Sequence, residues 1–169
     1  MTFSENMNVA PSQTMQGLPR AIYPLVLLYS MNSKKIIGRT RLEKLIFVIQ
    51  KRLIEDKKLG ITASNYDFRP YNFGPFTEEV LDDVESLSLM SLVSIDREGD
   101  NQEYDLTTKG VSAVESLIAK HRLTPEFVSE IRKIAKFLGD LPLQELVERV
   151  YKEYPDYAKN SLIKSRFLQ

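Results

Sequence analysis

The fold of this chain is decided by the stretch Pro75-Phe-Thr-Glu-Glu-Val-Leu-Asp-Asp-Val-Glu-Ser-Leu-Ser-Leu-Met-Ser-Leu-Val-Ser-Ile95, together with Glu103-Tyr-Asp-Leu-Thr-Thr-Lys-Gly110, which follows a polar loop. Apolar residues recur at helical spacing in the first part and then form a short continuous run. The pattern predicts, in order, a helix over 76–87, a strand over 92–95, a turn over 97–101, a return strand over 102–106 and a helix that begins at Thr107 or Thr108. A helix followed by a hairpin in this order is typical of a winged helix, a fold with many DNA-binding members.

A long central helix precedes this stretch. Apolar residues at helical spacing predict it over 40–58, with Thr40 as its N-cap. Before it we expect a helix over 19–30, which tolerates Pro24 only in its first turn, and a short strand at Ile36-Ile37.

Five aromatic residues crowd the segment between the central helix and the winged stretch: Tyr66, Phe68, Tyr71, Phe73 and Phe76. Two pairs at a spacing of two predict an extended hairpin that packs on the central helix. Core filling is the favoured interpretation, because aromatic side chains bury large areas. The alternative is a surface on which bases or a peptide stack.

Two more helices follow the winged stretch. Thr124-Pro125 is a clean helix start, Gly139 ends that helix, and a last helix follows Pro142. The sequence therefore predicts an α+β, mainly helical protein, with a winged-helix-like core, a small β-wing and C-terminal helices. The predicted organisation is a disordered N-terminal tail over 1–18, a winged-helix-like domain over 19–122, and a C-terminal helical extension over 123–169 packed on that domain or on a second subunit.

Composition excludes several classes of protein. The chain has 169 residues and no cysteine, so disulfides and thiolate zinc sites are excluded, and a reducing cytoplasm is the expected location. The longest apolar run lies near Ile22–Tyr29 and is too short to span a bilayer. The first 18 residues lack the pattern of a secretory signal.

The net charge of zero hides two oppositely charged segments. Residues 20–58 hold ten Lys and Arg against three acids, whereas residues 76–105 hold ten acids against one Arg. Two interpretations are open: two solvated faces that attract each other within the fold, or one basic and one acidic binding face.

Catalysis has little support in the sequence. The single histidine, His121, lies at the predicted end of a helix, where the helix dipole favours a cation. The pairs Glu78/Asp82 and Glu79/Asp83 place carboxylates on one helix face, but a solvated face explains them. We predict no enzyme, no metal and no cofactor. An enzyme would need a pocket in which paired acids meet a polar third group.

The acidic helix opposes the usual mode of DNA binding. A recognition helix meets phosphates on both sides of the groove, whereas residues 77–88 contain five acids and no Lys or Arg. If DNA binds, the better surface is the basic one formed by Lys34, Lys35, Arg39, Arg41, Lys44, Lys51 and Arg52. The alternative is that the acidic helix itself docks on a basic partner protein, through Glu78, Glu79, Asp82, Asp83, Tyr71 and Phe73.

Four segments together resemble a known family: Gly38-Arg-Thr-Arg-Leu-Glu-Lys-Leu-Ile-Phe47, Tyr71-Asn-Phe-Gly-Pro-Phe76, Tyr104-Asp-Leu-Thr-Thr-Lys-Gly110 and Val150-Tyr-Lys-Glu-Tyr-Pro-Asp-Tyr157. They resemble the YwgA-like proteins of bacteria and archaea, and are distantly similar to the Panacea domain of phage-associated and antitoxin proteins. The resemblance implies a small winged-helix fold and the neutralisation or regulation of a partner. It supplies no catalytic residues. Ser91 stands where winged-helix regulators usually place glycine before the first wing strand.

From these observations we expect a non-catalytic, regulatory winged-helix module that binds a partner protein, as an antitoxin or a complex subunit does. The first alternative is a DNA-binding transcriptional regulator that uses the basic face of residues 34–52. The second alternative is an enzyme that uses paired carboxylates. We also expect a homodimer and no membrane contact.

Overall fold

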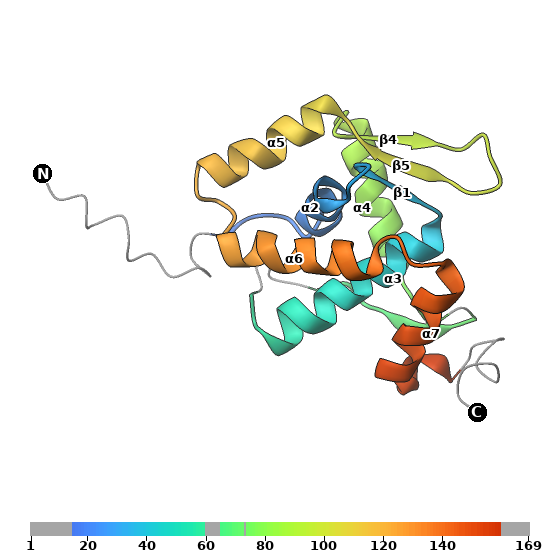
Figure 1. Cartoon of the computed structure of the whole chain (residues 1–169). Coiled ribbons are helices and arrows are strands. Elements are labelled where there is room, and N and C mark those ends of the chain that lie inside the picture. The colour runs from blue at the N-terminus through green and yellow to red at the C-terminus, as the bar shows by residue number, and fades with distance from the viewer. Residues whose placement is uncertain (1–14, 60–64, 73, 160–169) are drawn as a thin grey trace, which may run out of the picture.

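A computed structural model describes residues 15–59, 65–72 and 74–159. The structure is α+β and mainly helical, as predicted (Figure 1). Its elements are α2 (Ile22–Ser30), β1 (Lys35–Ile37), α3 (Arg39–Ile49), η1 (Gln50–Asp56), β2 (Arg69–Tyr71), β3 (Gly74–Phe76), α4 (Glu78–Leu89), β4 (Val93–Asp96), β5 (Glu103–Leu106), α5 (Thr108–Ala119), α6 (Pro125–Leu138), α7 (Leu143–Glu153) and η2 (Pro155–Ala158). No helix in the described part of the chain is long and apolar enough to cross a membrane.

The winged-helix order predicted from the sequence is present. Helix α2, strand β1, helices α3 and α4, and the β4–β5 hairpin follow one another. The three strands form one antiparallel sheet in the order β1-β5-β4, in which Tyr104 is paired with Ile36 on one side and with Ile95 on the other. Strands β4 and β5 project from one end of the molecule as the wing (Figure 1).

The Leu-Thr-x-x-Gly motif forms the joint between the wing and α5. Thr107 is the N-cap: its hydroxyl oxygen accepts the Gly110 N–H at 3.0 Å and donates to the carbonyl of Ser91 at 2.6 Å. A Cβ on Gly110 would overlap the carbonyl oxygen of Leu92, so only glycine fits. Ser91 has a φ of +62°, the left-handed conformation that glycine adopts most easily. Ser91 thus adopts the backbone conformation for which glycine is usually found at this position.

The start of the central helix differs from the prediction. The N-cap position is held by Gly38, with a φ of +93°, and Thr40 lies inside α3. The Gly38 N–H donates to the carbonyl of Gln102 at 2.7 Å, so pairing with the wing sets where the helix begins. After Ile49 the helix continues to Asp56 as a π-helical segment, which the apolar periodicity did not predict.

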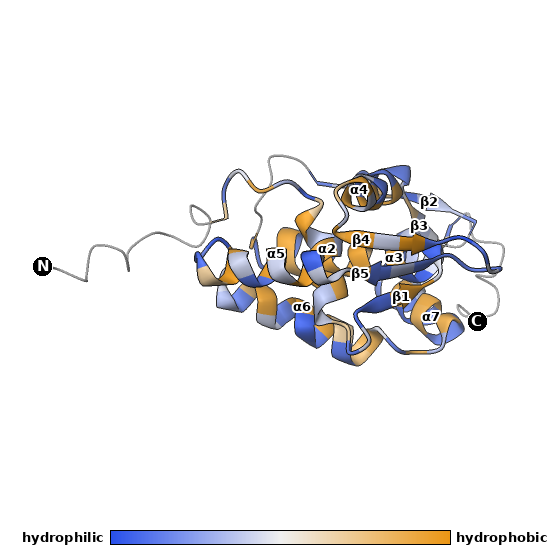
Figure 2. Ribbon diagram, turned by 90° about the horizontal axis from the view of Figure 1, so that it is seen from above, coloured by the Kyte–Doolittle hydropathy of each residue, from blue (hydrophilic) through white to orange (hydrophobic). Residues whose placement is uncertain are grey.

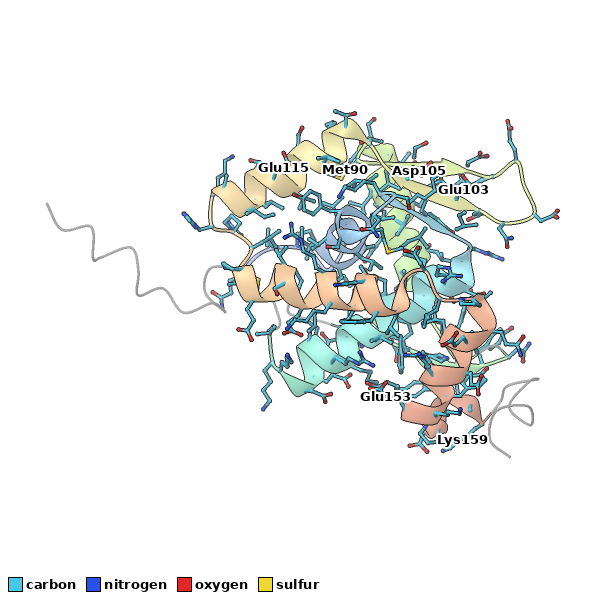
Figure 3. All side chains as sticks on the ribbon, viewed as in Figure 1. Met90, Glu103, Asp105, Glu115, Glu153 and Lys159 are labelled. Atoms are coloured by element: carbon cyan, nitrogen blue, oxygen red, sulfur yellow. The ribbon has the colours of Figure 1, made fainter. Side chains whose placement is uncertain are left out.

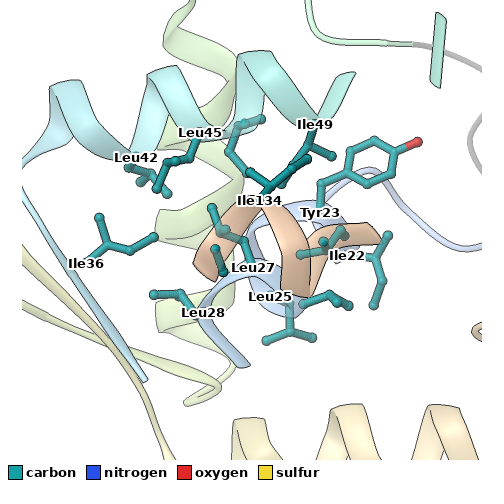
Figure 4. Packing of buried hydrophobic residues seen from close by; sticks show 14 of the residues in the cluster. Ile22, Tyr23, Leu25, Leu27, Leu28, Ile36, Leu42, Leu45, Ile49 and Ile134 are labelled. Carbon is teal, nitrogen blue, oxygen red and sulfur yellow. The ribbon is translucent and has the colours of Figure 1, made fainter. Parts of the chain in front are cut away.

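The core surrounds α2. Figure 4 shows Leu27 and Leu28 of α2 beside Leu42 and Leu45 of α3, with Ile134 of α6 closing the cluster. Figure 2 colours α2 as hydrophobic along most of its length, which fits its central position.

The C-terminal helices pack on this same chain. Helix α6 lies against α2 and α3, and α7 lies against α3. Most of their apolar residues are buried against this chain, whereas Phe137 of α6 and Leu143 of α7 stay exposed. The homodimer stays a prediction. Residues 15–18, which the sequence assigns to a disordered tail, instead form a turn in which Met15 is fully buried. The rest of that predicted tail, 1–14, lies outside the described residues.

Core filling is confirmed for part of the aromatic segment. Tyr66 and Phe68 are buried. The buried Gln50 side chain holds this segment, because its amide donates to the Tyr66 carbonyl at 2.8 Å and its Oε1 accepts the Tyr66 N–H at 2.7 Å. Tyr71 is exposed, and Phe73 lies outside the described residues. The predicted hairpin forms from β2 and β3.

Candidate functional site, a cleft between two helices and a hairpin

A cleft of about 570 Å³ opens where α3, the β2–β3 hairpin and α4 meet. In a winged helix α4 holds the place of the recognition helix, so this cleft lies beside the face on which function is expected. The side chains and backbone that line it are those of Arg39, Thr40, Glu43, Lys44, Tyr71, Gly74, Phe76, Glu78, Leu81 and Asp82.

The hairpin is fixed to α3 by a buried lysine. Lys44 is 1% exposed, and its Nζ donates to the carbonyl of Pro75 at 2.8 Å. Gly74 has a φ of +95°, and a Cβ there would lie 2.6 Å from Cε1 of Tyr151 and 3.2 Å from Cε of Lys44. The Gly-Pro-Phe corner is therefore a structural requirement: glycine permits the approach of α7, and the proline carbonyl satisfies the ammonium.

Glu43 is the unusual residue of the cleft. It is 5% exposed, and within the described residues no hydrogen-bond donor or ion-pair partner contacts its carboxylate. Burial raises the pKa of Glu43 to about 7, although the positive charges of Lys44 and Arg39 oppose the shift. Burial lowers the pKa of Lys44 to about 8, against the attraction of Glu43. Burial thus favours the neutral form of two neighbouring groups, and groups whose pKa values are strongly shifted are concentrated at functional sites.

The two carboxylate pairs of α4 face different directions. Glu79 and Asp83 form ion pairs with Arg20 at 2.6 and 2.9 Å, and Asp83 also accepts the hydroxyl of Tyr66 at 2.7 Å. Glu78 and Asp82 are exposed and line the cleft. Of the four predicted partner-binding acids, only Glu78 and Asp82 therefore line the cleft, together with the exposed ring of Tyr71.

The seven predicted DNA-binding residues do not form one free face. Lys44 is buried under the hairpin, and Arg41 donates to the carbonyls of Gly139 and Leu141 at 2.9 and 2.6 Å, at the end of α6. Lys51 pairs with Glu55 at 2.9 Å.

The remaining four also differ in their surroundings. Lys35 lies 3.6 Å from Glu103 and 3.7 Å from Asp105, and Arg52 lies 2.8 Å from Glu153; these acids are labelled in Figure 3. The Lys34 ammonium donates to the carbonyl of Tyr29. Arg39 is exposed at the mouth of the cleft. Of these seven cations, only Lys35 contacts acids of the 76–105 segment within the described residues. Attraction between the two charged segments therefore explains little of the basic set, and most of its members are held by backbone carbonyls or by acids elsewhere in the chain.

Sequence reasoning did not select Glu43 as a site residue. The signal was present: Glu43-Lys44 is a charged pair inside an otherwise continuous apolar run from Leu42 to Ile49. Charged residues are rarely fully buried without partners, so such a pair on a central helix indicates a polar site. His121, by contrast, is exposed just after α5. Within the described residues, no three His, Cys, Asp or Glu side chains converge as metal ligands do.

No family model, curated protein or solved structure matches the sequence. The resemblance to YwgA-like proteins and to the Panacea domain therefore stays a prediction.

Proposed function

We propose that the protein is a non-catalytic regulatory module, antitoxin-like or a complex subunit, that binds a basic partner protein through α4 and the cleft beside it. The observation that carries the proposal is the presentation of Glu78 and Asp82 on the exposed side of α4, in a cleft that the buried Glu43 also lines. Since α4 exposes no Lys or Arg, a cationic surface is its natural complement. The absence of cysteine favours action in the cytoplasm.

Site-specific photo-crosslinking tests this proposal. A photoreactive amino acid replaces Asp82 in the full chain, and a matched control replaces Glu115, which lies on α5 (Figure 3). We expect a discrete protein adduct from position 82 and none from position 115, with a contact peptide rich in Lys or Arg. Crosslinking to nucleic acid from position 82, or equal adducts from both positions, would contradict the proposal.

DNA-binding regulation is the first alternative, and Arg39 is its best remaining residue because it is exposed at the start of α3. Anisotropy of a labelled duplex of mixed sequence distinguishes it from protein binding. Binding through six to ten phosphates would weaken about a thousandfold or more between about 50 and 200 mM salt. We expect no binding with that salt dependence.

An enzyme is the second alternative, and one observation favours it. Catalysis would require a pocket in which paired acids lie beside a polar third group. Glu78 and Asp82 line the same cleft as Glu43 and Lys44, which supports this alternative. A group with a pKa near 7 can act as a general base at neutral pH. Turnover of a hydrolysable substrate by the wild type, lost in Glu43→Gln, would favour catalysis over binding.

A further inference from the structure

We infer that the cleft between α3, the β2–β3 hairpin and α4 receives one arginine side chain of the partner, with Glu43 as the buried carboxylate that pairs with its guanidinium. This inference rests on the proposed function and identifies the group that the cleft recognises. Its basis is the position of Glu43, which lines the cleft while being almost completely buried.

Within the described residues the Glu43 side chain is buried, yet no hydrogen bond or ion pair is formed with its carboxylate, which leaves that group open to a ligand in the cleft. Buried charged groups in proteins are paired or hydrogen-bonded, because desolvation of an isolated charge is costly. The nearest cation does not fulfil this role, since the Lys44 ammonium is directed to the Pro75 carbonyl at 2.8 Å. The oxygens of Glu43 thus retain their capacity to accept hydrogen bonds.

The charges around the cleft favour a cationic ligand. Glu43, Glu78 and Asp82 contribute three carboxylates, against the cations of Arg39 and Lys44. Arg39 is exposed at the mouth, where water screens its charge, and Lys44 is held by the hairpin. An anionic ligand would have to enter beside all three carboxylates.

The walls favour arginine over lysine. Tyr71 and Phe76 have ring centroids 5.0 Å apart, and Leu81 adds apolar surface to the lining of the same cleft. A guanidinium is planar, stacks on aromatic faces and is more weakly hydrated than an ammonium. It also presents its donors as a fork that matches a carboxylate, which leaves further donors for Glu78 and Asp82 at the rim.

The volume fits a side chain together with the backbone that carries it. At about 570 Å³ the cleft is in the range of small-molecule sites and exceeds what one arginine side chain fills. The ligand is therefore an arginine within a longer segment of the partner, whose flanking residues fill the rest of the cleft.

The test uses the full chain and a capped tripeptide, acetyl-Gly-Arg-Gly-amide, followed by NMR titration and calorimetry. A ligand of this size is expected to bind with a Kd of about 1 mM. We expect Glu43→Gln to weaken binding about tenfold or more, because a charge-assisted pair is lost. The matched peptides contain citrulline, which has the same shape without the charge, and lysine.

The outcomes separate the inference from the proposed function. Loss of binding with citrulline and with Glu43→Gln supports the inference, and equal binding of the lysine peptide would overturn the choice of arginine. No shift at the cleft at about 20 mM peptide, above the expected Kd, would overturn the inference altogether. If the Asp82 crosslink persists in that case, the acidic surface binds its partner without inserting a side chain, and the proposed function stands.

Discussion

Replacement of Glu43 by glutamine should stabilise the protein, and the gain should grow with pH. Glutamine has the shape of the protonated side chain but cannot ionise. The folded-state pKa of Glu43, about 7, lies above its ordinary value of 4.5, so the folded state holds a proton that the unfolded state releases. The contribution of Glu43 to the free energy of unfolding is therefore fully present below the ordinary pKa, and it is lost as the pH rises through the folded-state pKa of about 7.

The magnitude follows from the two pKa values. Each pH unit between 4.5 and about 7 removes about 1.4 kcal/mol, so ionisation of Glu43 costs the wild type about 3 kcal/mol at most. Between about pH 5 and pH 8 most of that loss accumulates, roughly 2.5 kcal/mol. Electrostatic coupling to Lys44 reduces the figure, and we expect Glu43→Gln to gain about 2 kcal/mol over this interval.

Urea denaturation of both proteins at a series of pH values measures the effect, and the difference between their free energies of unfolding is plotted against pH. At this chain length about 2 kcal/mol also corresponds to about 4–8 °C in Tm. Glu78→Gln is the matched control: it lines the same cleft but is exposed, so its effect should stay within about 0.5 kcal/mol.

A difference that stays constant from pH 5 to pH 8 would refute the reasoning, because the ionisation of Glu43 would then not be opposed by burial. A gain that grows equally in Glu78→Gln would attribute the effect to the general charge of α4 instead. The expected stabilisation also means that Glu43→Gln is folded, so its binding data can be interpreted.

Three further substitutions test the frame of the site by chemical denaturation. Gly74→Ala should lower the free energy of unfolding by about 2–4 kcal/mol, because the position has a φ of +95° and the new Cβ overlaps its neighbours. The control Gly17→Ala, with a φ of +81° in open space, should lower it by about 1 kcal/mol. Equal costs would show that the overlap at position 74 is relieved. Gln50→Leu should cost about 2–4 kcal/mol, because it leaves both buried backbone groups of Tyr66 without partners, and a cost below about 1 kcal/mol would mean that water replaces the amide. Arg20→Ala should cost about 1–2 kcal/mol, since it breaks a half-buried pair of ion pairs, and high salt should reduce that cost.

Most of the frame could be predicted from local sequence signals. Thr124 caps α6 as expected, and Thr107, one of the two expected starts, caps α5, because a hydroxyl at the N-cap satisfies a backbone N–H whatever the rest of the fold does. The wing strands followed from an apolar run, a polar turn and a return strand. The predicted start of α3 at Thr40 was wrong, because Gly38 pairs with the distant carbonyl of Gln102 and takes the N-cap position with a φ of +93°.

The site was harder to predict, since it depends on contacts between segments far apart in the chain. Composition alone placed Lys44 and Arg41 on a basic surface, yet one satisfies a hairpin carbonyl and the other satisfies the end of α6. Which acids of α4 are paired and which are exposed also depends on Arg20, which lies about 60 residues away in the chain and binds Glu79 and Asp83. Periodicity gives the angle of a side chain around its helix but not what lies opposite it.

The close approach at Gly74 has an evolutionary consequence. The hairpin and α7 are about 80 residues apart in the chain, yet Gly74 leaves room for the ring of Tyr151 and for the stem of Lys44. A lineage that acquires a side chain at position 74 must first, or at the same time, accept a smaller residue at 151. Among descendants of this protein the two positions should therefore vary together, and a glycine at 74 paired with a bulky aromatic at 151 would mark those that still possess the cleft.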